Sequence, residues 1–165
     1  MEIRKARAED LDRIMEIYSH AQDFMIAHGN PTQWAHVYPK RSLIEQDIAQ
    51  EISYVLCDGD IVLAVFALMS GEDPTYAVIE DGAWLNDEPY LTIHRSASDG
   101  SIHGVFHMIS DFCKGLCDNV RVDTHERNTV MRRAIAKEGF RYCGIIHQLD
   151  GTLRLAYQWC KKGLP

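Results

Sequence analysis

The sequence predicts an α/β fold with a mixed sheet of six to seven strands and helices on both faces. Strand-like and helix-like segments alternate along 165 residues, which is enough chain for one domain, 1–165, with a hydrophobic core. Two pairs of strand-like segments are each joined by Asp-Gly, at residues 58–59 and 150–151, and this dipeptide between apolar runs predicts a hairpin. A strand, a helix and a strand follow one another over residues 90–124, an order that requires a parallel, right-handed connection.

The first half of the chain predicts one strand, two helices and one hairpin. Apolar residues recur near helical spacing between Leu11 and Met25, and acidic residues precede them, as suits a helix N-terminus. Gly29-Asn30-Pro31 ends this helix. The predicted elements are a strand at 2–7, helices at 8–29 and 41–52 with an aromatic-rich loop at 30–39 between them, and strands at 53–57 and 60–69.

The second half predicts two strand–helix units followed by a second hairpin. A loop at 71–89, with at most one turn of structure, precedes them. Gly139 suits the end of the last helix, because glycine readily adopts the left-handed conformation found there. The predicted elements are strands at 90–98 and 119–125, helices at 100–117 and 127–139, and hairpin strands at 140–149 and 152–160.

Composition narrows the classes of function. Hydrophobic residues make up 46% and charged residues 25%, an ordinary balance for a globular protein, and no apolar run approaches the length of a membrane span. The N-terminal residues lack an apolar signal core, so we expect a cytoplasmic protein without a membrane partner. A net charge of −7 argues against nucleic-acid binding and is compatible with a cationic small molecule. Five cysteines without a Cys-x-x-Cys pair predict reduced thiols and no bound metal.

The segment SDGSIHG, residues 98–104, lies between a predicted strand and a predicted helix. A diphosphate binds where several backbone N–H groups point one way at the positive end of a helix dipole. Gly100 can adopt the positive φ that opens such a turn, Ser101 can add a hydroxyl, and His103 can approach the phosphates. The sequence also suits a plain strand-to-helix turn with Gly100 as its hinge. From this segment alone the plain turn is favoured. The residues that a diphosphate would contact are Gly100, Ser101, Ile102, His103, Gly104 and Val105, and their assignment to a cofactor rests on the resemblance described next.

The order of elements resembles the GNAT superfamily of acyl-CoA-dependent N-acyltransferases, over nearly the whole chain. Three segments carry the local match, HRSASDGSIHG (94–104), VDTHERNTVMRRAIAKEGF (122–140) and RYCGII (141–146). The second is the most specific, since Asn128 is followed eleven residues later by Gly139 and then by Phe140. In the phosphate loop only Gly104 fits the superfamily pattern, and Phe106 stands where a small residue is expected. The resemblance implies a three-layer fold and acetyl-CoA as cosubstrate.

The resemblance also implies which residues contact the pantetheine arm of the cofactor. In the superfamily this arm pairs with the strand before the phosphate loop, here Leu91, Thr92, Ile93 and Arg95. Arg95 could also form an ion pair with a phosphate or within the cleft. Asn128 corresponds to an asparagine that binds pantetheine, although it also suits an N-cap of the following helix. The tyrosine that often serves as general acid in the superfamily is replaced by Ile135.

Two residues are candidates for the chemistry of acyl transfer. His125 ends a predicted strand and could relay a proton, since imidazole titrates near neutrality; the alternative is a structural histidine. Glu80 could take the proton of the attacking amine through water or bind a cationic acceptor; the alternative is a solvated loop charge. No cysteine has an evident activating histidine, so direct attack of the amine is expected instead of an acyl-cysteine.

Aromatic residues in two loops are predicted to contact the acceptor. Gln33, Trp34 and Tyr38 combine apolar area with polar groups, as small-molecule sites do, and Trp84 and Tyr90 could face them. The alternative for Trp34 is a core side chain. In the superfamily the segment between the first two helices covers the substrate end of the cleft, so the resemblance implies acetyl transfer from acetyl-CoA to a small-molecule or amino-acid-like amine. The alternatives are a CoA-binding domain without turnover and a protein N-acetyltransferase. The resemblance also implies that the C-terminal hairpin could pair between the subunits of a homodimer.

Overall fold

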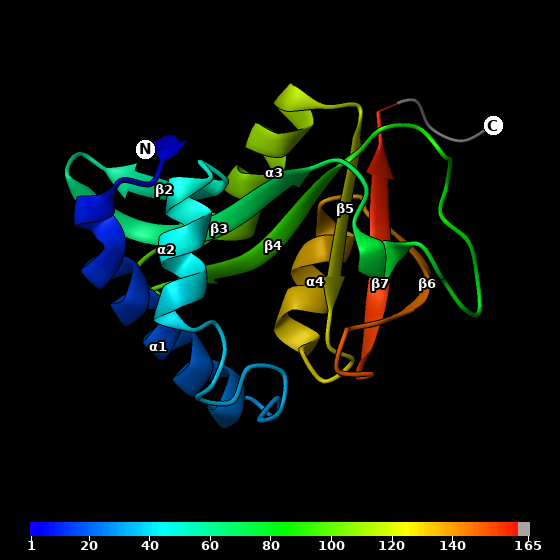
Figure 1. Ribbon diagram of the computed structural model, residues 1–165, viewed down its shortest axis with the longest axis horizontal. Coiled ribbons are helices and arrows are strands. Elements are labelled where there is room, and N and C mark those ends of the chain that lie inside the picture. Colours follow the sequence, from blue (N-terminus) through cyan, green and yellow to red (C-terminus); the bar gives the residue numbers. More distant parts are fainter. Residues whose placement is uncertain (162–165) are drawn as a thin grey trace. The chain divides into compact units, whose positions relative to one another are not determined.

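The fold is α/β, as the computed structural model of the chain shows for residues 1–161 (Figure 1). Seven strands form a mixed sheet in the order β1-β2-β3-β4-β5-β7-β6, and the described residues include four α-helices, so the predicted fold class is confirmed. The chain divides into two compact units. The first holds Met1–Leu68 and His94–Ile109, and the second holds Met69–Ile93 and the chain from Ser110 onward. A single domain over 1–165 stays a prediction.

The first unit is built on an antiparallel strand meander. Strand β1 pairs with β2, and β2 pairs with β3 through the predicted Asp-Gly hairpin, in which Gly59 has a φ of +57°. The predicted helix at 8–29 is split, because a 3₁₀ turn at Ala8–Asp10 precedes the α-helix. The elements are β1 (Glu2–Lys5), α1 (Leu11–Ala27), α2 (Arg41–Ala49), β2 (Ser53–Asp58), β3 (Ile61–Ser70) and part of β4 (Leu91–Ser98).

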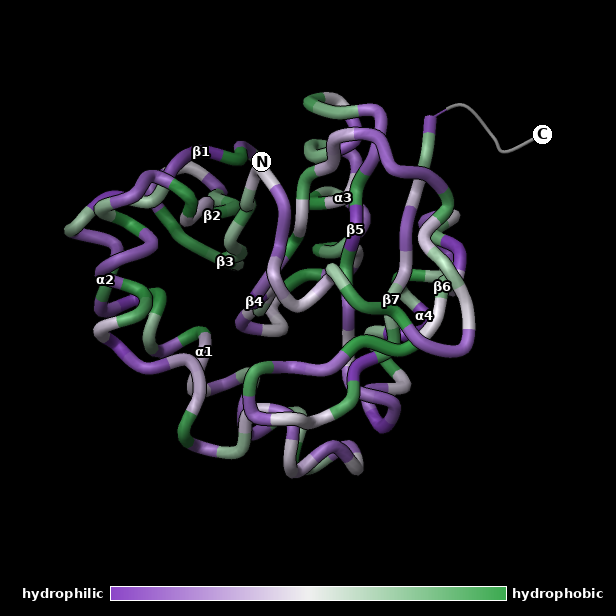
Figure 2. The backbone as a smooth tube through the Cα atoms, turned by 45° about the vertical axis from the view of Figure 1, so that its right-hand side comes forward, coloured by the Kyte–Doolittle hydropathy of each residue, from purple (hydrophilic) through white to green (hydrophobic). Residues whose placement is uncertain are grey.

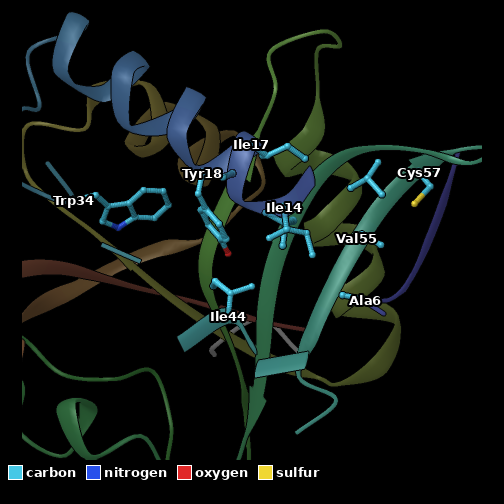
Figure 3. Packing of buried hydrophobic residues seen from close by; sticks show 11 residues of the cluster. Ala6, Ile14, Ile17, Tyr18, Trp34, Ile44, Val55 and Cys57 are labelled. Atoms are coloured by element: carbon cyan, nitrogen blue, oxygen red, sulfur yellow. The ribbon is translucent and has the colours of Figure 1, made fainter. Parts of the chain in front are cut away.

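The core of the first unit lies between helices α1 and α2 and one face of β2 and β3 (Figures 1 and 3). Ile14 and Ile17 of α1 and Ile44 of α2 are fully buried against Val55 and Val65. Hydrophobic and hydrophilic residues are both present along α2 (Figure 2), and Ile44 and Ile48, one turn apart, contact this core. Burying an aliphatic side chain of this size contributes about 1.5–3 kcal/mol, so this core stabilises the elements between which the loop at 30–39 runs.

The second unit is built around β5. The first residues of β4, Leu91–Ile93, pair in parallel with Val120–Val122, and β5 pairs with β7 on its other side. The predicted hairpin at Asp150-Gly151 joins β6 to β7. The helix predicted at 100–117 begins only at Val105, because Gly104 has a φ of +75° that a helix does not allow. The elements are α3 (Val105–Leu116), which starts in the first unit, β5 (Asn119–Thr124), α4 (Thr129–Lys137), β6 (Arg141–His147) and β7 (Leu153–Cys160).

The segment predicted as a loop at 71–89 lies against strand β6. Glu80 forms a two-way backbone bridge with Ile145, each N–H donating to the other carbonyl at 2.8 Å. Glycines permit this approach, since a Cβ on Gly82 would overlap the carbonyl oxygen of Cys143, and one on Gly144 would lie 2.5 Å from that of Glu80. Periodicity could not reveal the bridge, because it depends on two glycines far apart in sequence. No helix among the described residues is both long and apolar enough to cross a membrane.

Candidate functional site

The loop between β4 and α3 has two glycines with positive φ. Gly100 has a φ of +76° and Gly104 a φ of +75°, a region that residues with a Cβ rarely adopt. The N–H of Met108 donates to the carbonyl of Gly104 at 3.1 Å, which is the start of the α-helical ladder. The loop therefore leads directly onto the positive end of the α3 dipole, an arrangement that suits an anion. Phosphate binding by the six predicted loop residues stays a prediction.

Asp99 occupies the hydrogen-bond donors of Ser101 in this structure. Its Oδ1 accepts the backbone N–H of Ser101 at 2.9 Å and the hydroxyl at 2.5 Å, and its Oδ2 lies 2.5 Å from Nη2 of Arg13. Burial alone would raise the pKa of Asp99, but the hydrogen bonds from Ser101 and the charge of Arg13 outweigh it and lower the pKa. Sequence reasoning missed Asp99 and Arg13, although Asp-Gly-Ser is a recognisable side-chain-capped turn.

His20 of helix α1 lies against the same loop. A Cβ built on Gly100 would meet the Nε2 atom of His20 at 3.1 Å, which is tighter than ordinary van der Waals contact. A side chain at position 100 would therefore displace the imidazole as well as strain the backbone. His103 is exposed and Ile102 is half-buried.

The predicted pantetheine contacts on β4 divide into two groups. Leu91, Thr92 and Ile93 form the parallel ladder with β5, and the side chains of Thr92 and Ile93 are buried. Because β5 occupies this edge of β4, a pantetheine arm could pair with the same edge only beyond Ile93. Contact between these three residues and the cofactor stays a prediction.

Arg95, the fourth of these residues, forms a buried ion pair. It has a φ of +52°, and Nε and Nη2 each donate to a different oxygen of Asp47 at 3.0 Å. Its Nη1 donates to the Tyr38 hydroxyl at 3.1 Å, and its carbonyl accepts the Tyr18 hydroxyl at 2.8 Å. Burial raises the pKa of Asp47, and the charge of Arg95 opposes that rise. Arg95 thus pairs with a buried carboxylate of its own unit and fixes Tyr38 to strand β4, and its contact with a cofactor stays a prediction.

The aromatic loop at 30–39 is anchored at several points in the first unit. Gln22 donates to the carbonyl of Tyr38 at 2.8 Å, and Gln33 accepts the amide of Asn30 at 2.7 Å. Trp34 is 7% exposed and packs edge-on against Tyr18, with ring centroids 5.7 Å apart (Figure 3). Tyr38 is 36% exposed, so it offers more surface to a ligand than Trp34 does. Acceptor binding by Gln33, Trp34 and Tyr38 stays a prediction.

His125 follows strand β5 and has a defined tautomer. Its Nδ1 accepts the backbone N–H of Arg127 at 3.1 Å, so the neutral ring carries its proton on Nε2. Burial, and then the charge of Arg154, lower the pKa of His125. The side chain is therefore a neutral hydrogen-bond donor near pH 7, and its part in proton transfer stays a prediction.

Glu80 pairs with His147 at the edge of the sheet formed by strand β6, whereas His125 follows strand β5. Nε2 of His147 lies 3.1 Å from Glu80, and this hydrogen bond is the main cause that raises the pKa of His147. The backbone register runs from Glu80 through Ile145 and Leu155 to Thr124. Three strand spacings separate the first and last residues, about 14 Å. The structure therefore does not bring Glu80 beside Thr124, the residue before His125.

Trp84 and Tyr90 belong to a partly buried cluster around Arg121. The guanidinium carbon of Arg121 lies 4.1 Å from the ring centroid of Trp84 and 3.8 Å from that of Tyr90. Trp84 also donates to the carbonyl of Tyr76, whose hydroxyl donates to Asp123 at 2.6 Å. Sequence reasoning missed Arg121 and Tyr76, because only the fold of the loop at 71–89 brings Tyr76 and Trp84 against β5, the strand that holds Arg121. Contact of Trp84 or Tyr90 with an acceptor stays a prediction.

Asn128 is the N-cap of helix α4. Its side-chain oxygen accepts the N–H of Met131 at 3.2 Å, as the capping alternative requires, and its role toward the cofactor stays a prediction. Ile135, at the position of the superfamily's tyrosine, is fully buried. At this position the chain therefore has an apolar core side chain and not the tyrosine that serves as general acid elsewhere in the superfamily.

Comparison with solved structures identifies the class of protein. The chain is 33% identical to a GNAT-family acetyltransferase from Streptococcus agalactiae 2603, over 98% of this chain and 96% of that one, with a TM-score of 0.85. A GNAT-family acetyltransferase from Listeria monocytogenes, 19% identical over 95% and 92% of the two chains, has the same fold with a TM-score of 0.68. So does the ribosomal-protein-S18-alanine N-acetyltransferase from Escherichia coli, at 12% identity over 99% and 96%, with a TM-score of 0.63.

Neither a scan against models of protein families nor a search of curated proteins found a match. Fold and similarity nevertheless define an acetyltransferase. The chain belongs to the GNAT family.

Proposed function

We propose that this protein transfers the acetyl group of acetyl-CoA to the amine of a small-molecule or amino-acid-like acceptor. The observation that carries the proposal is the similarity to a GNAT-family acetyltransferase over nearly the whole of both chains. The glycine loop that leads onto α3 supports it, because Gly100 and Gly104 have the backbone conformation that lets N–H groups face a diphosphate.

The reaction is direct attack. The amine nitrogen forms a bond to the acetyl carbon, the carbon–sulfur bond breaks, and the CoA thiolate leaves and takes up a proton. The Nε2–H of His125 donates to the thioester carbonyl or to the leaving sulfur, which stabilises the negative charge that develops there. The attacking amine passes its proton to water. Glu80 has no role in this step, because it pairs with His147 and lies about 14 Å from Thr124, the residue before His125.

The acceptor is a small amine bound by the loop at 30–39. Tyr38 is exposed enough to contact it, while hydrogen bonds from Gln22 and Arg95 hold that tyrosine in place. A net charge of −7 favours an acceptor with positive charge. The cytoplasm, where acetyl-CoA is available, is the proposed location.

A second candidate function is a CoA-binding domain without turnover. The buried Ile135 in place of the superfamily's tyrosine favours it, because a core isoleucine cannot donate a proton to the leaving thiolate. The two candidates share the cofactor site and differ only in chemistry.

Thiol release from acetyl-CoA in the presence of a panel of amines distinguishes the candidates. For an acetyltransferase, acetyl-CoA raises the melting temperature and at least one amine releases thiol. His125→Ala then lowers kcat by about tenfold or more without changing the affinity for CoA, as expected for a lost hydrogen bond to developing charge. His28→Ala, which removes an exposed histidine at the end of α1, is the matched control and leaves kcat unchanged.

Binding of acetyl-CoA without thiol release to any amine would favour the second candidate. A protein that neither binds acetyl-CoA nor gains thermal stability from it would contradict both.

A further inference from the structure

The cofactor loop carries a negative charge at the position where a phosphate would bind. Asp99 takes both the backbone N–H and the hydroxyl of Ser101, two of the donors that the proposed diphosphate site would use. We propose that Asp99 is a specificity-determining residue of this site, which competes with the ligand for Ser101 and disfavours phosphates of high charge. This inference rests on the proposed function, since it takes the loop at 99–104 as the diphosphate site.

The carboxylate is held at the loop and cannot swing freely into solvent. Nη2 of Arg13 lies 2.5 Å from Asp99, and Nε of the same guanidinium donates to the carbonyl of Val62 at 3.1 Å. The side chain of Asp99 is 15% exposed. Because Arg13 is fixed to strand β3 as well as to Asp99, the negative charge keeps its place when a ligand approaches.

The positive charge of Arg13 does not cancel this effect for a ligand on the Ser101 side. Oδ1 of Asp99 faces Ser101, whereas Oδ2 faces Arg13. A phosphate oxygen that accepts the Ser101 donors must replace Oδ1 and then lie next to the same carboxylate. Nη1 of Arg13 also lies 3.2 Å from Oε2 of Glu16, so the positive charge of Arg13 is balanced in part by a second carboxylate.

Repulsion by a fixed charge grows with the charge of the ligand. At a separation of about 6 Å in a water-like dielectric, it weakens binding by about threefold for each negative charge on the ligand, and salt reduces the effect. A diphosphate diester such as that in CoA carries two charges, and inorganic pyrophosphate carries three or more near pH 7. Asp99 therefore penalises free pyrophosphate more than it penalises the cofactor.

Asp99→Asn is the decisive variant, because the asparagine oxygen still accepts the Ser101 N–H and preserves the turn while the charge is lost. Isothermal titration calorimetry at low salt compares 3′-dephospho-CoA, inorganic pyrophosphate and pantetheine, which lacks phosphate. We expect affinity to rise about fivefold to tenfold for 3′-dephospho-CoA, to rise more for pyrophosphate, and to stay the same for pantetheine. Arg13→Gln should act in the opposite direction and weaken 3′-dephospho-CoA binding by about threefold.

Asp150→Asn is the matched control, since Asp150 caps the hydroxyl and N–H of Thr152 in the same way at a hairpin. Affinities of Asp99→Asn equal to those of the wild type, or a gain that includes pantetheine, would overturn the inference and leave the proposed function intact. Failure of wild type and variants alike to bind 3′-dephospho-CoA would overturn the proposed function and this inference with it.

Discussion

The same short turn occurs at the start of α3 and at the tip of the C-terminal hairpin. In Asp99-Gly100-Ser101 and Asp150-Gly151-Thr152, the aspartate oxygen accepts the N–H two residues later, at 2.9 Å and 3.0 Å. It also accepts the hydroxyl of that residue, at 2.5 Å and 2.7 Å. The glycines have nearly equal φ values, +76° and +84°. Local sequence alone therefore determines the geometry of both turns.

The surroundings of the two turns differ. Asp99 pairs with Arg13 and Gly100 lies against His20, whereas a Cβ on Gly151 would have no atom within 4 Å. The first turn leads onto α3 and the second only reverses the chain between β6 and β7. A turn motif therefore becomes a candidate ligand site through the element that it leads into and the side chains that pack on it.

Substitution of the two glycines by alanine should give the largest difference in CoA affinity between the two turns. Gly100→Ala strains a positive φ, at a cost of about 1 kcal/mol or more, and pushes its Cβ toward His20, so we expect CoA to bind at least about tenfold more weakly. Gly151→Ala carries a similar backbone strain but should leave CoA binding unchanged. Calorimetric titration with CoA measures both, and equal losses in the two variants would break the distinction.

Removal of the hydroxyls of Ser101 and Thr152 should give a smaller difference in CoA affinity, again with the loss at the first turn. If Ser101 donates to a phosphate oxygen when CoA binds, Ser101→Ala loses one such bond and weakens binding by about threefold to tenfold. Thr152→Ala removes the equivalent hydroxyl from the hairpin and should not affect the affinity. Competition between CoA and a fluorescent CoA analogue would resolve this difference, and an unchanged affinity of Ser101→Ala would show that Asp99 keeps the hydroxyl in the complex.

The free energy of unfolding should depend on pH through Asp99, and this effect should be smaller than the two changes in CoA affinity. Hydrogen bonds and Arg13 lower the pKa of folded Asp99 below its unfolded value, so its contribution is complete above about pH 4 and is lost as the pH falls through the folded pKa. We expect Asp99→Asn to reduce the free energy of unfolding by about 1 kcal/mol at pH 7.

The difference between Asp99→Asn and the wild type should shrink as the pH falls below about 4, as measured by urea denaturation at several pH values. The pKa of Asp150 is lowered as well, mainly by hydrogen bonds from Thr152, but its side chain is fully exposed and we expect no resolvable change from Asp150→Asn. If the free energies of unfolding of Asp99→Asn and the wild type differed by the same amount from pH 7 to pH 2, the charge of Asp99 would not be the source of its stabilising effect.

The sequence predicted those features that depend on neighbouring residues. Both Asp-Gly hairpins and the Asn128 cap arise from local backbone and side-chain preferences, and the structure has all three. The order of strands and helices was sufficient to predict the fold class, because few topologies join such elements by short connections. Even the error at helix α3 was local, since the positive φ of Gly104 delays the helix to Val105.

The features that the sequence could not predict depend on residues far apart along the chain. Arg95 and its partner Asp47 are separated by 48 residues, and Arg13 and its partner Asp99 by 86 residues. No periodic pattern in the sequence links the members of these pairs. The tautomer of His125 was likewise hidden, because it depends on the path of the backbone to Arg127. Candidate site residues can be chosen by type from a sequence, but their partners, and so their chemistry, come from the fold.

Backbone amide NMR during titration with CoA tests the central claim most directly. We predict that the largest ¹H–¹⁵N shift changes include the amides from Gly100 to Val105, because these groups lie at the proposed diphosphate site. The amides of Gly151 and Thr152, in the matching turn, should not move. Saturable CoA binding that leaves the amides of residues 100–105 unperturbed, or that shifts both turns equally, would contradict the assignment of this loop as the cofactor site.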